Sequence, residues 1–233
     1  MIRVVNLIKS FGVLQVLKGI SLQINRGEIV ALLGKNGAGK TTFIKILATL
    51  SQPSSGAIQI AGMDLKLRAN SVRQKLGLLS HNPFLYGDLS AEENLNFFGK
   101  MYGVPSLKER IAELLDRVEL TTRRYDLVRT FSRGMQQRLA IARAILHQPQ
   151  ILLLDEPFTG LDVNAGRILT DLLHSLQAQG LTILSSTHQV DFALKHCDRV
   201  LVLNEGILAL DEASKSASTM KIHDLLGRRG KEP

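Results

Sequence analysis

The sequence predicts an α/β fold built around a parallel sheet. Residues 29–33 and 151–154 are continuously apolar, which is typical of strands buried on both faces of such a sheet. Residues 181–186 are also strand-like. Helical periodicity follows the first run from about Lys40 and the second run over 165–179. This alternation is the β-α-β rhythm of a parallel sheet.

Two regions depart from that rhythm and predict antiparallel strands. Within the first 33 residues, segments 13–17 and 20–24 alternate apolar and polar residues and are interrupted by glycines, one of them Gly19. We expect short antiparallel strands there, forming an N-terminal β subdomain. Near the other end, 200–203 and 207–210 predict a hairpin that turns at 204–206.

A helical stretch interrupts the strand-helix alternation. From Ser90 to Pro149 the apolar residues recur with helical periodicity. Ser106 and Glu109 have the spacing of a capping box, which predicts a helix start at this point. We expect residues 1–233 to form one domain, with a helical subdomain inserted at about 82–148 and a loose tail at about 227–233.

Composition limits the class of protein. Cys197 is the only cysteine, which excludes an internal disulfide framework and suits a reducing compartment. The first residues lack the pattern of a signal peptide, and no apolar run approaches the roughly 20 residues needed to span a bilayer. We therefore expect a cytoplasmic protein. The net charge is +8, but the basic residues are scattered, so we expect no nucleic-acid partner.

Residues 34–41 match the phosphate-binding pattern G-x-x-x-x-G-K-[ST], and they lie between a predicted strand and a predicted helix, as that loop requires. Its glycines allow backbone N–H groups and a helix N-terminus to point at phosphates. Lys40 is expected to reach the β and γ oxygens, and Thr41 to ligate Mg²⁺. The predicted nucleotide-binding residues are Gly34, Lys35, Asn36, Gly37, Ala38, Gly39, Lys40, Thr41 and Thr42.

Two acidic residues, Asp155 and Glu156, follow the apolar run at 151–154. This places them at the carboxyl edge of the predicted sheet, where ligands bind in open α/β folds. With a phosphate loop upstream, we assign Asp155 to the metal site and Glu156 to the base that activates water. A strand-end acid that only caps a helix is the alternative.

Four further segments resemble one family. Residues 131–138, Phe-Ser-Arg-Gly-Met-Gln-Gln-Arg, resemble the signature sequence of ABC ATPases, and 159–162 resemble its D-loop. His188 looks like the family's switch histidine, and Phe11 falls where a ring stacks on adenine. Phe11 as an ordinary core residue is the alternative. The resemblance covers nearly the whole chain and implies a P-loop NTPase core of the RecA-like type.

The resemblance also implies roles. Two ABC ATPase subunits bind two ATP molecules between them. The resemblance therefore implies a homodimer in which Ser132 and Gly134 face the γ-phosphate held by the second chain. Lys40, Glu156 and His188 would be catalytic, with ATP and Mg²⁺ as cofactors. Asp162 would shape the contact between the two chains.

Two segments depart from the usual family pattern, the signature and the loop that contains His81. Arg133 and Met135 replace a small residue and an amide in the signature. His81 stands where most relatives carry a glutamine that senses Mg²⁺, so we include it with Thr41 and Asp155 as a metal-site residue. An ordinary exposed loop histidine is the alternative at this position.

Within the family, residues 78–83, 87–95, 155–159, 161–164 and 187–189 look like the ATP-binding subunit of the heme exporter of cytochrome c maturation. The chain is also similar to ATPases of other small exporters of drugs, lipids or ions. The resemblance implies integral membrane subunits as partners and a peripheral position on the cytoplasmic face of the membrane. The aromatic residues of the inserted helices are either a docking groove for such a partner or core.

Two other classes of protein remain as alternatives. Soluble ABC proteins that act on DNA or ribosomes usually carry a second ATPase domain or a long coiled coil, and neither is present in this sequence. A module that binds ATP without hydrolysis would not need Glu156 and His188 together with Lys40. A transport ATPase is therefore the favoured prediction.

Overall fold

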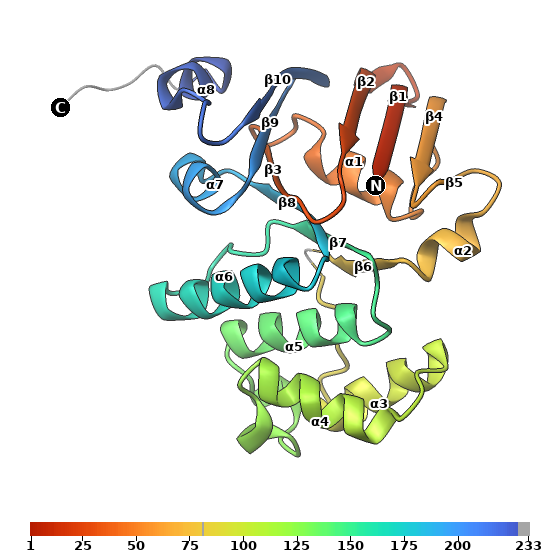
Figure 1. The fold of residues 1–233 in the computed structure, drawn as a ribbon, viewed down its shortest axis with the longest axis vertical. Helices are drawn as coiled ribbons and strands as arrows, with labels where there is room; N and C mark the ends of the chain where they lie inside the picture. Colours follow the sequence, from red (N-terminus) through yellow and green to blue (C-terminus); the bar gives the residue numbers. More distant parts are fainter. Residues whose placement is uncertain (81, 228–233) are drawn as a thin grey trace.

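The centre of the molecule is a six-stranded sheet with the strand order β10-β9-β3-β8-β7-β6. The computed structural model describes residues 1–80 and 82–227, and Figure 1 shows their fold. Strands β9, β3, β8, β7 and β6 run parallel, and β10 is an antiparallel edge strand. The strands are β3 (Ile29–Leu33), β6 (Leu76–Leu79), β7 (Ile151–Asp155), β8 (Thr182–Thr187), β9 (Arg199–Asn204) and β10 (Ile207–Ala213). The predicted parallel sheet and C-terminal hairpin are confirmed.

A second, antiparallel sheet has the order β2-β1-β4-β5. It comprises β1 (Ile2–Phe11), β2 (Leu14–Ile24), β4 (Ser55–Ile60) and β5 (Met63–Asp64). The expected break at Gly19 is wrong, because β2 continues through this residue. Leu7 pairs with Ile20 and Ile8 with Lys18, which leaves Gly19 as an extra residue with a φ of 90°. The glycine therefore forms a β-bulge inside one long strand.

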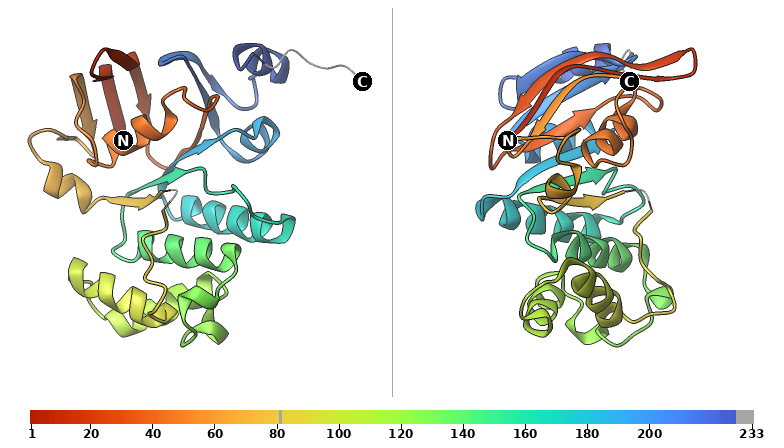
Figure 2. Two further views of the ribbon diagram at one scale, coloured as in Figure 1. Left: turned by 180° about the vertical axis from the view of Figure 1, so that it is seen from behind. Right: turned by 90° about the vertical axis from the view of Figure 1, so that its right-hand side faces the viewer.

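Helices cover the central sheet and extend the molecule at one end. The antiparallel sheet and the helices α3 and α4 lie at opposite ends (Figures 1 and 2). Within residues 1–80 and 82–227, no helix combines the length and apolar character needed to cross a membrane. The helices are α1 (Lys40–Leu47), α2 (Ala69–Arg73), α3 (Ala91–Tyr102), α4 (Leu107–Arg117), α5 (Arg133–Ile145), α6 (Val163–Ala178), α7 (Val190–His196) and α8 (Thr219–Leu225), with short 3₁₀ turns η1 (Thr121–Arg123) and η2 (Val128–Thr130).

The predicted capping box at Ser106 is wrong. Ser106 precedes α4 with a φ of 46°, and its side chain makes no capping hydrogen bond. A capping serine normally has an extended backbone, and the left-handed conformation of Ser106 departs from that geometry. The capping box lies instead at the start of α3, where the Ser90 hydroxyl accepts from the N–H of Glu93 and the Glu93 carboxylate accepts from the N–H of Ser90.

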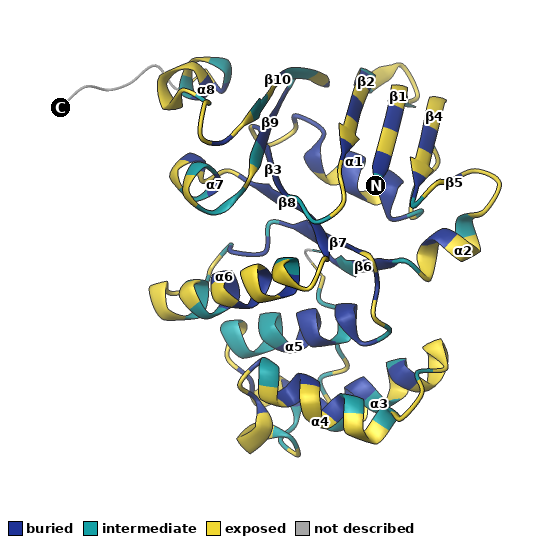
Figure 3. Cartoon of the chain, viewed as in Figure 1, coloured by how far each residue is buried: buried dark blue, intermediate teal, exposed yellow. Residues whose placement is uncertain are grey.

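The apolar strands are buried on both faces, as the sequence predicts (Figure 3). In β7, Ile151 and Leu153 pack into the cluster that contains α1 and the antiparallel sheet. Leu152 and Leu154 point the other way, into the cluster formed with α5 and α6. Because alternate residues of one strand enter two cores, β7 joins the two layers of the molecule.

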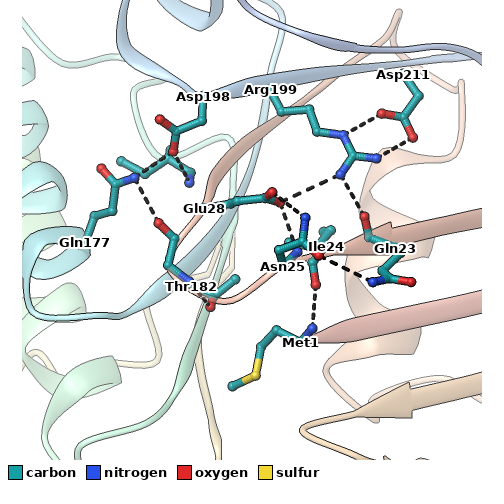
Figure 4. A network of polar contacts seen from close by, with 12 residues as sticks. Met1, Gln23, Ile24, Asn25, Glu28, Gln177, Thr182, Asp198, Arg199 and Asp211 are labelled. Carbon is teal, nitrogen blue, oxygen red and sulfur yellow. Dashed lines mark hydrogen bonds and ion pairs between the residues drawn. The ribbon is translucent and has the colours of Figure 1, made fainter.

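A polar network joins the two sheets at the amino ends of the parallel strands (Figure 4). Arg199 in β9 donates to both carboxylate oxygens of Asp211, at 2.5 and 2.6 Å, and to the carbonyl oxygen of Gln23 in β2, at 2.8 Å. The Glu28 carboxylate lies 3.7 Å from Arg199 and accepts from the backbone N–H of Asn25. This network holds β2 against the central sheet at the end that lies away from residues 34–41.

The close approach of α5 to β6 predicts that Gly77→Ala destabilises the fold. A Cβ atom at Gly77 would lie 2.4 Å from the carbonyl oxygen of Ala144 in α5, so the helix would have to move away from the sheet. We expect the free energy of unfolding, measured in urea, to fall by about 1–3 kcal/mol.

Gly166→Ala in α6 is the matched control, since a Cβ atom there meets nothing within 4 Å. Alanine is the better helix former, so this variant should gain up to about 1 kcal/mol. Equal unfolding midpoints for the two variants would contradict the assignment of Gly77 as a contact position.

Candidate nucleotide-binding site

Residues 34–39 link the end of β3 to the start of α1. Two glycines of this loop pack closely against neighbouring strands. A Cβ atom at Gly34 would lie 2.6 Å from the carbonyl oxygen of Leu203, and a Cβ atom at Gly39 would lie 2.7 Å from a methyl carbon of Leu17. Gly39 precedes α1 with a φ of 106° and offers no capping side chain. The first N–H groups of α1 are therefore left to bind an anion.

The side chain of Lys40 lies inside this loop. It is 6% exposed, and its Nζ donates to the carbonyl oxygens of Gly34, at 2.8 Å, and Lys35, at 3.3 Å. The Glu156 carboxylate approaches the same Nζ to 3.4 Å. The ammonium group is thus positioned by the loop backbone at the place where phosphate oxygens would replace the carboxylate as its partner.

Asp155 forms the next part of the site. It is 5% exposed, and its Oδ1 accepts from the hydroxyl of Thr41, at 3.2 Å, and from that of Ser186, at 2.7 Å. Asp155 and Ser186 are register partners on the adjacent strands β7 and β8. Ser186 was missed by the sequence reasoning, since a serine inside a strand carries no local signal. Its role follows only from the pairing of the strands.

The oxygens of Thr41 and Asp155 are donors of the kind that Mg²⁺ prefers. Among the residues that the structure describes, no three histidine, cysteine or acidic side chains are grouped as a metal site. Two protein oxygens suit a magnesium ion, because Mg²⁺ in nucleotide sites is commonly held by one or two protein side chains together with phosphate oxygens and water. His81, the third predicted metal-site residue, lies outside the described residues, as does the predicted tail beyond Gly227.

Glu156 and His188 lie together at the carboxyl ends of β7 and β8. The Glu156 Oε2 is 2.9 Å from the Nδ1 of His188 and 3.5 Å from the hydroxyl of Thr159. These groups border a cavity of about 650 Å³. The cavity is lined by Gly34, Lys35, Asn36, Glu156, Thr159, His188 and Leu226.

Leu226, just after α8, lines the cavity and is a second residue of the site that the sequence did not predict. The neighbouring Gly227 packs against Lys35, because a Cβ atom at Gly227 would lie 2.6 Å from the Nζ of Lys35. The end of α8 is therefore part of the wall around the phosphate loop. Its residues follow no recognisable pattern, so nothing in the sequence connects them with the loop.

Phe11, Ser132 and Gly134 are among the predicted residues that do not line this cavity. Phe11 at the end of β1 is 54% exposed, with the Nζ of Lys9 at 4.6 Å from its ring centroid, so the alternative of a core residue is wrong. Ser132 caps the start of α5, where its hydroxyl accepts from the N–H of Met135 at 3.3 Å. Gly134 packs on α6, since a Cβ atom there would lie 3.0 Å from that of Ala165.

Comparison with known proteins identifies the family. Residues 17–159 match the family model described as ABC transporter. The chain belongs to the ABC transporter family. It is the ATP-binding, ATP-hydrolysing domain of that family, as its phosphate loop and acidic pair predict.

Several curated proteins are similar to this ABC ATPase. The ABC transporter ATP-binding protein NatA of Bacillus subtilis is 39% identical, over 83% of this chain and 80% of NatA. The linearmycin resistance ATP-binding protein LnrL of the same organism is 36% identical, over 88% of this chain and 67% of LnrL. The Nod factor export ATP-binding protein I of Ralstonia nicotianae is 36% identical, over 85% of this chain and 62% of that protein.

Solved structures agree with the fold. An ATP-binding subunit of an ABC transporter superposes with a TM-score of 0.84 at 33% identity, covering 99% of this chain and 95% of that one. The cassette MJ0796, solved as a dimer bound to ADP and Pi, superposes with a TM-score of 0.84 at 28% identity, covering 93% of this chain and 100% of that one. CbiO1 of Clostridium perfringens, part of the complex cbiONQ, has a TM-score of 0.86 at 29% identity, with coverage of 95% and 91%.

The position of Glu156 predicts that Glu156→Gln binds ATP but hydrolyses it at least about 10²-fold more slowly, because the amide accepts no proton from water. Phosphate release and the binding of a fluorescent ATP analogue would measure the two effects. Glu205→Gln is the matched control, since Glu205 has a similar φ of 46° but lies in the β9–β10 turn. Hydrolysis by Glu156→Gln at the rate of this control would refute the assignment.

Neighbouring serines in β8 provide a second test. Ser186→Ala removes a donor to the buried carboxylate of Asp155 and the acceptor of the Glu156 N–H, so we expect a loss of about 1–3 kcal/mol in the free energy of unfolding. The Mg²⁺ concentration for half-maximal hydrolysis should also rise. Ser185 is 3% exposed, and its hydroxyl has no hydrogen-bond partner in the described part of the chain. Ser185→Ala should therefore be neutral or stabilising, and equal effects of the two changes would contradict the role of Ser186.

Proposed function

We propose that this chain is the ATP-hydrolysing subunit of an ABC exporter. The observation that carries the proposal is that Glu156 contacts both Lys40 and His188, while Glu156 and His188 line the cavity beside the phosphate loop. A site that only bound ATP would need the loop but not a carboxylate directed into the cavity by a histidine. The arrangement therefore favours hydrolysis over nucleotide sensing.

In this proposal each residue has a distinct role. The loop N–H groups and Lys40 bind the phosphates and offset their charge. Glu156 accepts a proton from the attacking water, and His188 orients its carboxylate through the 2.9 Å contact at Nδ1. Thr41 and Asp155 would hold Mg²⁺, which supplies positive charge to the phosphates when bound. Phe11, being exposed, offers its ring to adenine.

A second copy of the chain would complete the site. Ser132 and Gly134 do not line the cavity of their own chain, and Ser132 is exposed at the start of α5. The relative MJ0796 is dimeric in its ADP- and Pi-bound structure. We therefore propose a homodimer in which the start of α5 in one chain faces the nucleotide bound by the other.

The membrane partner would bind at an aromatic patch on and beside α3. Tyr86 and Phe97 have ring centroids 5.2 Å apart, and Phe97 and Phe98 are equally close. Most of these rings are 41–50% exposed, which argues against a purely core role. Exposed rings on a charged protein favour a protein contact. The patch comprises Phe84, Tyr86, Phe97, Phe98 and Tyr102.

Export is the direction that the relatives favour, because two of them are named for Nod factor export and linearmycin resistance. Heme export for cytochrome c maturation is the more specific proposal, and it rests only on the motif resemblance at 78–83, 87–95, 155–159, 161–164 and 187–189. Drugs, lipids and ions are the alternative cargoes. In each case the chain would lie on the cytoplasmic face of the membrane, held there by its integral partner.

Co-expression with the cognate integral subunit tests this function. We expect the chain to sediment with membranes only when that subunit is present, and we expect the subunit to alter its ATPase rate. Replacing Phe97 by serine should weaken the association, whereas replacing the exposed Met220 on α8 by serine should not. Recovery with ribosomes or DNA, with no dependence on a membrane subunit, would overturn the proposal.

A strain that lacks the gene for this chain would test heme against the other cargoes. Loss of mature c-type cytochromes on deletion, restored by the wild-type chain but not by Glu156→Gln, would support heme export. Unchanged cytochromes would exclude heme as the required cargo and would leave the ATPase assignment intact.

A further inference from the structure

The backbone of Glu156 is strained. Its φ is 54°, in the left-handed region that residues other than glycine rarely adopt. The next residue is Pro157, and a residue before proline normally takes an extended conformation. Such a conformation costs about 1–3 kcal/mol and persists only where the surrounding structure holds it.

Two side chains hydrogen-bond to the backbone of this strained turn. The hydroxyl of Ser186 in β8 accepts from the N–H of Glu156 at 2.9 Å. The side-chain amide of Gln137 in α5 donates from Nε2 to the carbonyl oxygen of Pro157 at 2.7 Å. One bond precedes the Glu156 side chain along the backbone and the other follows it. Together they fix the direction in which its carboxylate leaves the chain.

The first turns of α5 contact the same loop at two more points. The side chain of Arg133 lies across Gly160, where a Cβ atom would come within 2.8 Å of its Nε and Cζ atoms. Gly134 packs against Ala165 at the start of α6. The loop between β7 and α6 is therefore held along its length by the helix that carries the signature residues.

We propose that Gln137 is a positioning residue for ATP hydrolysis, which holds the Glu156–Pro157 turn so that the Glu156 carboxylate points into the nucleotide cavity. The inference rests on the proposed role of Glu156 as base. Gln137 does not line the cavity, so it would act through its hold on the turn that carries Glu156. Ser132 and Gln137 lie in the first turns of the same helix, α5. A nucleotide held by a second chain and bound by Ser132 would therefore also influence the position of Glu156.

Steady-state kinetics of Gln137→Ala tests the inference. Small misplacements of a reacting group are costly, so we expect kcat to fall about 10- to 100-fold. The dissociation constant for a fluorescent ATP analogue should stay at the wild-type value, because the phosphate loop is untouched. Gln137→Glu should be equally slow, since it keeps the length of the side chain but presents no donor to the Pro157 carbonyl.

Gln177→Ala is the matched control. Gln177 lies in α6, and its side-chain amide also donates to a backbone carbonyl oxygen, that of Gly27 at 3.0 Å, at the opposite ends of the strands from Glu156. We expect kcat close to wild type for this variant. Combining Gln137→Ala with Glu156→Gln should add no further loss of hydrolysis, because the two residues act as one unit.

Each outcome decides between the two proposals. Wild-type kcat in Gln137→Ala, with Glu156→Gln inactive, overturns the positioning role and leaves the proposed function standing. Equal losses in Gln177→Ala and Gln137→Ala also overturn it, because they indicate a general weakening of the fold. Hydrolysis that is insensitive to Glu156→Gln overturns both proposals.

Discussion

The buried carboxylate of Asp155 is the constraint on which the rest of the site depends. A carboxylate taken out of water must be hydrogen-bonded, and here the hydroxyls of Thr41 and Ser186 provide the bonds. Thr41 belongs to α1 and Ser186 to β8, so this requirement ties three neighbouring elements together at one end of the sheet. The relative position of the phosphate loop and the catalytic edge follows from it.

The order of the strands brings the other residues of the candidate site close to Asp155. Strand β8 lies between β3 and β7, so the loops that leave the carboxyl ends of all three meet at one edge. These loops carry Lys40, Glu156 and His188, which are far apart in the sequence. At the amino ends of the strands, the network around Arg199 holds the antiparallel sheet in place. The candidate site therefore lies at the carboxyl ends of the parallel strands, and the supporting network lies at their amino ends.

Short sequence patterns predicted the elements whose structure depends mainly on neighbouring residues in the chain. The apolar run at 151–154 and the spacing of 34–41 are sufficient to indicate a buried strand and a phosphate loop. Ser106 shows the limit, because its spacing to Glu109 suits a capping box while its backbone conformation prevents one. Ser186 and Leu226 were missed for another reason: their positions depend on strand pairing and on the packing of α8, which no short segment encodes. The bulge at Gly19 likewise depends on the strand opposite.

The strained backbone of Glu156 has a consequence for how such a chain can change over generations. Glycine would relieve the strain at this position, and asparagine would tolerate the left-handed conformation better than glutamate does. A lineage that no longer needed hydrolysis would therefore gain stability by losing this side chain. Under its proposed role as base, glutamate at position 156 serves hydrolysis at the expense of stability, and a stabilised descendant with glycine there would be a subunit that has kept its fold and lost its chemistry.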